Sequence, residues 1–243
     1  MKIYKEVSSK WYVVRLLIII ASGCMLFSCA GRKDADKKIF RYNQPEGIAS
    51  LDPAFAKNQA IMWGVHQLFN TLVEVDEKLQ IKPSLCRRWM VSDDWLTYTF
   101  ILRDDVYFHD NPAFPGGKGR KMIAADVAYS LQRIISTTTA SPGAWIFNNR
   151  IDTADGFTAL NDTTFQLKLL RPFHPILGIL SMQYCSVVPH EAIEKYGTGF
   201  ARNPCGTGPF RFTRWEEGQV LLMAKNENSF ARDSVGKRLP YAA

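Results

Sequence analysis

Residues 96–102 have the sequence LTYTFIL, in which large apolar residues alternate with mostly polar ones. This period of two residues is typical of a β-strand that buries one face. Further along the chain, residues 124–135 have the sequence AADVAYSLQRII, whose apolar residues recur every three to four positions. That spacing predicts an amphipathic helix. Together, the two patterns predict a mixed α/β (α+β) fold.

The rest of the chain repeats both patterns. We expect strands at 39–42, 71–75, 89–92, 164–169, 184–188, 210–212 and 220–223, and helices at 58–69, 176–180 and 191–196. Asp93-Asp94 and Glu217-Gly218 are turn signals, and each predicts a hairpin between its neighbouring strands. No repeat of fixed period is visible in the sequence, which excludes solenoid and propeller folds.

The composition is that of an ordinary globular protein. The 243 residues are 47% hydrophobic and 22% charged, which excludes a wholly disordered or collagen-like chain. The formal net charge is +7, and +3 of it lies in residues 1–28. No basic stripe stands out in the remainder, so we expect no nucleic-acid partner. The length suffices for one domain or two modest ones.

The first 28 residues predict export from the cytoplasm. Residues 1–15 carry four basic side chains against one acidic side chain, and residues 16–27 follow without a charge. This uncharged run is shorter than the roughly 20 residues that a permanent membrane-spanning helix needs. The pattern fits a signal peptide over 1–28 that is cleaved.

A cysteine directly follows this leader. The sequence Leu26-Phe27-Ser28-Cys29 resembles the bacterial lipobox, in which the cysteine thiol is lipidated and becomes the new N-terminus. Cys29 is therefore the predicted lipidation site, with a polar tether over 29–38. Cys24 is a second candidate, although no Leu or Val lies three residues before it. The alternatives are an ordinary signal peptide with an incidental cysteine and an uncleaved transmembrane helix.

Three cysteines lie beyond the leader and the predicted lipidation site, namely Cys86, Cys185 and Cys205. An odd number leaves at least one thiol unpaired. A disulfide between Cys185 and Cys205 would close a loop of about twenty residues and contribute roughly 3 kcal/mol. Buried free thiols are the alternative. The sequence has no Cys-x-x-Cys pair, so we expect no cysteine zinc site.

Signatures of catalysis are absent from the sequence. It contains no Gly-x-Ser-x-Gly elbow and no His-Glu-x-x-His motif. The four histidines lie in unrelated segments, at His66, His109, His174 and His190. We expect His109 to bond locally, in a turn that Asp110 caps. The glycine-rich stretches 116–119 and 206–209 lack the context of a phosphate-binding loop. We therefore predict no enzyme, no metal site and no cofactor.

Several motifs, taken in order, resemble those of the family 5 extracellular solute-binding proteins, the peptide-binding lipoproteins of ABC importers. The motifs are SLDP at 50–53, QLFNTLV at 67–73, PSL at 83–85 with Arg88-Trp89, LTYTFILR at 96–103, VYFHD at 106–110, AADVAYSLQR at 124–133, and GTGPF at 206–210 with Lys225-Asn226. The family usually has threonine before the helix at 124, where this chain has Ile123. We expect Asp126 in the first turn to replace part of that cap.

The resemblance implies a periplasmic-binding-protein-like fold with two lobes that close on a ligand like a hinged trap. Residues 39–69 and 180–243 would form part of the first lobe, and residues 70–179 an accessory domain packed beside it. No sequence for the distal lobe follows, so we expect an N-terminal portion with the distal lobe missing. The alternative is a compact binding protein with a single lobe.

The resemblance also implies a function. The protein would be a substrate-binding lipoprotein on the periplasmic face of a bacterial membrane, capturing peptides or similar small solutes for ABC permease subunits. In the family, a stretch after the Leu-Asp-Pro turn pairs with the peptide main chain. Here that stretch is Lys57, Asn58 and Gln59, which alternatively only begin the helix. The competing functions are a lipid-anchored sensing or interaction protein on the same scaffold and an exported hydrolase. The identity of the ligand and the choice of inner or outer membrane stay open.

Overall fold

The computed structural model describes residues 38–233, 235–237 and 239–240. The chain divides into two compact units, 1–39 and 40–243, and the second contains nearly all the described residues. The predicted signal peptide, with Cys24 and Cys29, lies outside the described residues, as does all of the predicted tether except Lys38. Among the helices that are described, none has the length and apolar character needed to cross a bilayer.

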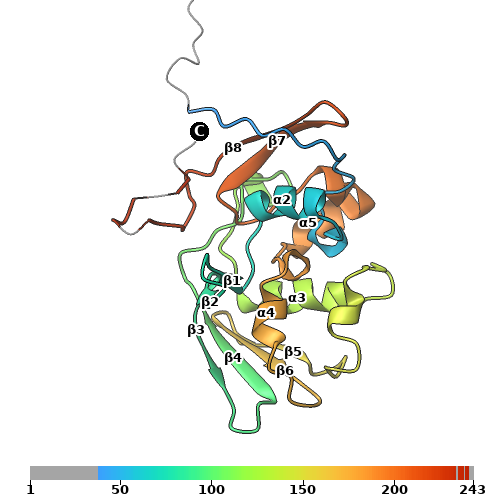
Figure 1. Cartoon of the computed structure of the whole chain (residues 1–243), viewed down its shortest axis with the longest axis vertical. Helices are drawn as coiled ribbons and strands as arrows, with labels where there is room; N and C mark the ends of the chain where they lie inside the picture. Colours follow the sequence, from blue (N-terminus) through green and yellow to red (C-terminus); the bar gives the residue numbers. More distant parts are fainter. Residues whose placement is uncertain (1–37, 234, 238, 241–243) are drawn as a thin grey trace, which may run out of the picture. The chain divides into compact units, whose positions relative to one another are not determined.

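A four-stranded antiparallel sheet forms the centre of residues 70–179, which we call the middle segment (Figure 1). The predicted alternation at 96–102 is confirmed, because Tyr98, Phe100 and Leu102 are buried. Phe100 lies opposite Phe165 in the register of the neighbouring strand. The strands lie in the order β3 (Cys86–Val91), β4 (Thr97–Leu102), β6 (Thr164–Lys168) and β5 (Phe157–Asn161).

The helix predicted at 124–135 is confirmed as α3 (Ala124–Ile135), and it packs against β5 and β6. Its buried face contains Val127, Leu131 and Ile134. Ile123 offers no hydroxyl cap, and the Asp126 carboxylate accepts the Ile123 backbone N–H at 2.9 Å. This bond pairs a backbone N–H group just before the helix, as the sequence predicts.

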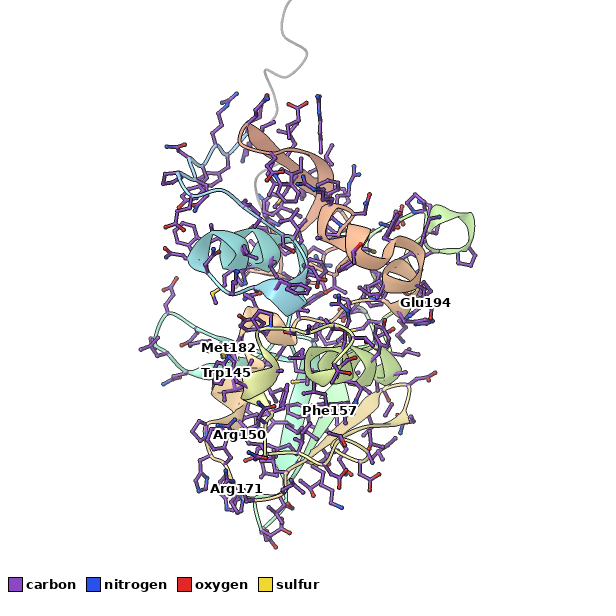
Figure 2. The ribbon with its side chains drawn as sticks, turned by 90° about the vertical axis from the view of Figure 1, so that its right-hand side faces the viewer. Trp145, Arg150, Phe157, Arg171, Met182 and Glu194 are labelled. Carbon is purple, nitrogen blue, oxygen red and sulfur yellow. The ribbon has the colours of Figure 1, made fainter. Side chains whose placement is uncertain are left out.

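The remaining elements are short. In the middle segment they are the strands β1 (Val73–Val75) and β2 (Ile81–Pro83) and the short 3-10 helices, labelled η, η2 (Pro115–Gly117) and η3 (Ala144–Ile146). In residues 40–69 and 180–233, which we call the flanking segments, they are η1 (Pro53–Phe55), α2 (Gln59–Leu68), η4 (Gln183–Cys185), α5 (His190–Tyr196), η5 (Gly197–Arg202), β7 (Phe210–Glu216) and β8 (Val220–Lys225). Between the two parts lies α4 (Ile176–Leu180). Figure 2 shows Phe157 and Arg171 of the middle segment below Glu194 of α5.

Two predicted strands are wrong. Residues 39–42 are not in a strand, and Tyr42 instead packs its ring against Trp63 of α2, with 5.1 Å between centroids. Residues 184–188 begin in η4 and continue without a ladder partner. Their amide groups find other acceptors, because Val187 donates to the Asn70 carbonyl and Val188 donates to Ser130 Oγ. The strands β2 and β5 were not predicted, since neither shows a buried alternation.

The loop at 206–209, which we call the GTGP loop, joins the flanking segments to the middle segment. The Gly208 N–H donates to the Leu68 carbonyl at 2.9 Å, at the end of α2, where helix carbonyl groups lack helical partners. The Gly208 carbonyl in turn lies 2.9 Å from His109 Nε2 and 2.9 Å from Asn226 Nδ2. One backbone carbonyl thus accepts hydrogen bonds from a side chain of the middle segment and a side chain of the flanking segments.

The prediction that His109 bonds locally is therefore wrong, since its hydrogen-bond partner lies 99 residues further along the chain. The Gly208 carbonyl can only accept, so His109 carries its proton on Nε2. The side chain is buried, and Nδ1 has no hydrogen-bond partner among the described residues. Burial lowers the pKa of His109 to about 4, so the imidazole is neutral at physiological pH.

Two groups of ion pairs connect the same parts of the chain. Arg133 of α3 makes two bonds to the Asp52 carboxylate, at 2.8 and 2.5 Å, and the side chains are 12% and 5% exposed. Arg120 binds both Asp126 of α3 and Glu191 of α5. Removing one partner of a pair as buried as the first costs about 3–5 kcal/mol. The contacts explain why residues 40–243 form one compact unit.

Gly208→Ala should lower the free energy of unfolding by about 1–3 kcal/mol, measured by urea denaturation. A Cβ at position 208 would lie 2.4 Å from the Leu68 carbonyl carbon and 2.6 Å from the Gln67 oxygen, so the backbone would have to move. Gly47→Ala is the matched control, because its Cβ would meet no atom within 4 Å. Equal unfolding midpoints for the two variants would contradict the predicted close packing.

The stability should also fall as the pH drops from about 6.5 to about 4. In this window the unfolded chain protonates His109 and the folded protein does not, so acid favours unfolding by up to about 3 kcal/mol. His109→Gln keeps a side-chain N–H donor and removes the titration, so its stability should fall less over this window. His66→Gln, at an exposed histidine, is the control and should follow the wild type. The explanation fails if the two variants show the same pH profile.

Candidate functional site

Lys57, Asn58 and Gln59 lie together on the surface, in the turn that leads into α2, and all three are exposed. Asn58 is the N-cap residue of α2, and its Oδ1 accepts the Ile61 N–H at 3.0 Å. The three residues therefore do begin the helix, which was the alternative to a ligand-pairing role. Their pairing with a ligand stays a prediction.

The backbone of this turn has groups that could pair with an extended ligand. Asn58 is in an extended conformation, with φ −139° and ψ 166°. The Lys57 N–H is already used, because it donates to the Phe55 carbonyl at 2.7 Å. The Asn58 and Gln59 N–H groups have no acceptor among the described residues, as is usual at the start of a helix. Two adjacent donors thus face the solvent at this position.

The exposed side of α2 continues from this turn. Gln59, Trp63 and His66 follow at spacings of four and three residues, which places them on one helix face. Gln183 approaches this face, with its Nε2 atom 3.1 Å from His66 Nδ1. The amide nitrogen can only donate, so Nδ1 is the acceptor in this contact.

A hollow of about 190 Å³ lies at the far end of this face, next to the C-terminus of α2. The helix has ten residues, so the hollow is about 15 Å from Asn58. Four stretches of chain line it, through His66, Phe69, Asn70, Thr71, Glu74, Val75, Ser84, Ser181 and Gln183. Sites for drug-sized ligands have about 300–1,000 Å³. The hollow therefore suits one side chain of a ligand rather than a whole peptide.

The sequence did not predict this hollow. His66 is one of four unrelated histidines in the sequence, while Asn70, Glu74 and Gln183 belong to no common motif. The hollow forms because α4 contacts β1, as Figure 1 shows, and brings residues 181–183 to the end of α2. The helical spacing that placed His66 on the exposed side of α2 was the only local signal.

The histidines do not share a site. His174 packs its ring against Trp95, with centroids 4.8 Å apart. His190 lies with Asp126 and Glu191, and their ligand atoms fall within 4.8 Å of one another. Arg120 donates to both carboxylates, so this group is an ion-pair cluster with the guanidinium at its centre.

All three cysteines in the described residues are free and buried. The free-thiol alternative is thus the one that the structure shows, and Cys185 and Cys205 do not form a disulfide. Burial raises the pKa of the Cys86 thiol to about 11 and that of Cys185 to about 12. Both thiols are protonated at neutral pH and are poor nucleophiles.

Comparison with known proteins identifies the family. The model of the bacterial extracellular solute-binding proteins, family 5 Middle, matches residues 80–242. The chain is 34% identical over 179 residues to the probable di/tripeptide-binding protein 5 of Pseudomonas aeruginosa, covering 68% of this chain and 33% of the relative. It is 27% identical over 178 residues to the glutathione-binding protein GsiB of Escherichia coli O1:K1 / APEC, covering 73% and 32%.

A solved structure extends the likeness to the fold. It is the ABC transporter-associated periplasmic binding protein DppA from Helicobacter pylori in complex with the peptide STSA, with a TM-score of 0.66 and 28% identity. The match covers 75% of this chain and 38% of that chain. The chain spans about a third of the length of the two curated relatives. Its mixed α/β fold corresponds to part of a two-lobed periplasmic binding protein. The chain belongs to the family 5 bacterial extracellular solute-binding proteins.

Proposed function

We propose that the protein is the solute-binding component of an ABC importer and captures peptides or similar small solutes at the cell envelope. The family match over residues 80–242 is the observation that carries this proposal. The Pseudomonas aeruginosa relative is named for di- and tripeptides, and the Helicobacter pylori structure holds a peptide. The partners of the protein would be permease subunits in the membrane, which receive the captured solute.

In this proposal, residues 39–69 and 180–243 belong to the first lobe and residues 70–179 to an accessory domain. A protein that closes by hinge motion needs each moving body to be rigid. The GTGP loop and the Asp52–Arg133 ion pair support a single rigid body, because they connect the flanking and middle segments. Closure would then occur between this body and the second lobe.

The exposed turn at Lys57–Gln59 would supply main-chain groups to the solute. A peptide has evenly spaced donors and acceptors, so pairing with its main chain gives affinity whatever its side chains are. The free N–H groups of Asn58 and Gln59 are suited to donate hydrogen bonds to peptide carbonyl oxygens. Recognition of this kind explains how one site takes peptides of different sequence.

Calorimetric titration of the purified protein with alanine tripeptide tests this function. We expect binding that changes little in the double variant Lys57→Ala/Gln59→Ala, because the backbone N–H groups remain. A tripeptide whose first peptide bond is replaced by a trans-alkene, which removes that carbonyl oxygen, should bind at least about tenfold more weakly, since loss of a buried hydrogen bond costs about 1–3 kcal/mol. The proposal fails if no tripeptide binds. Main-chain recognition fails if the alkene peptide binds equally well.

We also propose that Cys29 carries a lipid that anchors the mature protein to the membrane. The support is the sequence Leu26-Phe27-Ser28-Cys29, which overlaps the end of the uncharged stretch 16–27. In cells fed an alkyne-labelled palmitate, the wild-type protein should take up the label and Cys29→Ala should not. Cys24→Ala is the matched control and should stay labelled. Label that depends on Cys24 instead would overturn the assignment.

A further inference from the structure

The hollow at the end of α2 has a distinctive charge. Glu74 is the only acidic residue among its lining residues, which include no lysine and no arginine. Lys82 lies opposite Glu74 in the β1–β2 ladder, but its ammonium group binds Asp76 at 2.5 Å. In the described part of the chain, Glu74 thus has no ion-pair partner of its own. The hollow therefore carries a negative charge that no contacting cation neutralises, although the Lys82 ammonium group acts on Glu74 at longer range.

Two of the three hydroxyl groups in the lining add acceptors. Thr71 Oγ1 donates its proton to the Val73 carbonyl at 2.6 Å, and Ser181 Oγ donates to the Gly178 carbonyl at 2.7 Å. A hydroxyl whose hydrogen is already engaged in a hydrogen bond can only accept a hydrogen bond from a ligand. The amide nitrogen of Gln183 is likewise used by His66. His66 Nε2, the Asn70 amide and the Ser84 hydroxyl keep donor groups, so the carboxylate of Glu74 decides the preference.

We propose that this hollow binds a positively charged group of the captured solute, a primary ammonium or a guanidinium such as ends a lysine or arginine side chain. Such groups are pure donors, and they complement a carboxylate flanked by hydroxyl oxygens. The volume of about 190 Å³ suits one such side chain. The hollow lies about 15 Å along α2 from Asn58, so one peptide of a few residues reaches both places. The inference rests on the proposed solute-binding function, to which it adds a preference for basic solutes.

The first experiment tests the hollow without peptide capture. The purified protein is titrated with n-butylammonium and, separately, with n-butanol, and the side-chain amide signals of Gln183 and Asn70 are followed by NMR. We expect saturable shifts with n-butylammonium only, and these shifts should weaken as sodium chloride is added. Glu74→Gln should weaken n-butylammonium binding by about threefold or more, as expected for a partly exposed ion pair.

Glu77→Gln is the matched control, because it removes the same charge from an exposed turn residue outside the hollow. It should leave n-butylammonium binding within about 1.5-fold of the wild type. The inference is overturned if n-butanol gives the same shifts, if n-butylammonium gives none, or if the two variants lose affinity equally.

The second experiment links the hollow to solute capture. Calorimetry should show that Ala-Lys-Ala binds at least about threefold more tightly than Ala-norleucine-Ala, which has a side chain of similar length without the charge. Glu74→Gln should abolish this difference. If both peptides bind equally well to the wild type, the hollow does not select basic solutes, but the proposed function stands. If neither peptide binds while n-butylammonium still occupies the hollow, the proposed function fails instead.

Discussion

The rest of the described structure depends on a backbone contact between the GTGP loop and the last turn of α2. Neither Gly206 nor Gly208 has room for a Cβ, since each would meet the Leu68 backbone at 2.4 Å or less. This approach lets the Gly208 N–H reach a carbonyl at the helix end, while its own carbonyl holds His109 and Asn226. The contact positions α2, and α2 carries both the exposed turn at its start and the hollow at its end.

The sequence predicted the parts of the fold that local periodicity specifies. The strand β4 and the helix α3 were predictable because their apolar residues alternate or recur over six or more positions. The role of Asp126 at the start of α3 was also predictable, since a carboxylate in the first turn is a local feature. The strand predicted at 184–188 was wrong because the amide groups there bond to the Asn70 carbonyl and to Ser130 Oγ, not to a neighbouring strand.

The candidate site was much less predictable than the fold. Its polar residues come from stretches as far apart as His66 and Gln183, which are 117 residues apart and meet only after folding. The same limit applies to the Asp52–Arg133 ion pair, whose partners are separated by 81 residues. A resemblance to a family can point to the turn at Lys57–Gln59, but it cannot show that Glu74 lacks an ion-pair partner.

The two proposed contacts with a solute divide affinity and selectivity between them. In these proposals, main-chain N–H groups at the start of α2 would recognise what all peptides share, whereas the charge of Glu74 would favour particular side chains. The two curated relatives are named for glutathione and for di- and tripeptides, which illustrates that one scaffold serves different solutes. Differences at positions that line the hollow would then account for differences in solute.

Native-state hydrogen exchange tests most directly the claim that the flanking and middle segments form one rigid body. The Val187 N–H donates to Asn70 and the His109 N–H donates to Gly206, so both amide groups report on the junction between the segments. We expect them to exchange with the same opening free energy as the Phe100 amide in the central strand β4. Exchange of the two junction amides through a separate opening, lower in free energy by about 2 kcal/mol or more, would contradict the account.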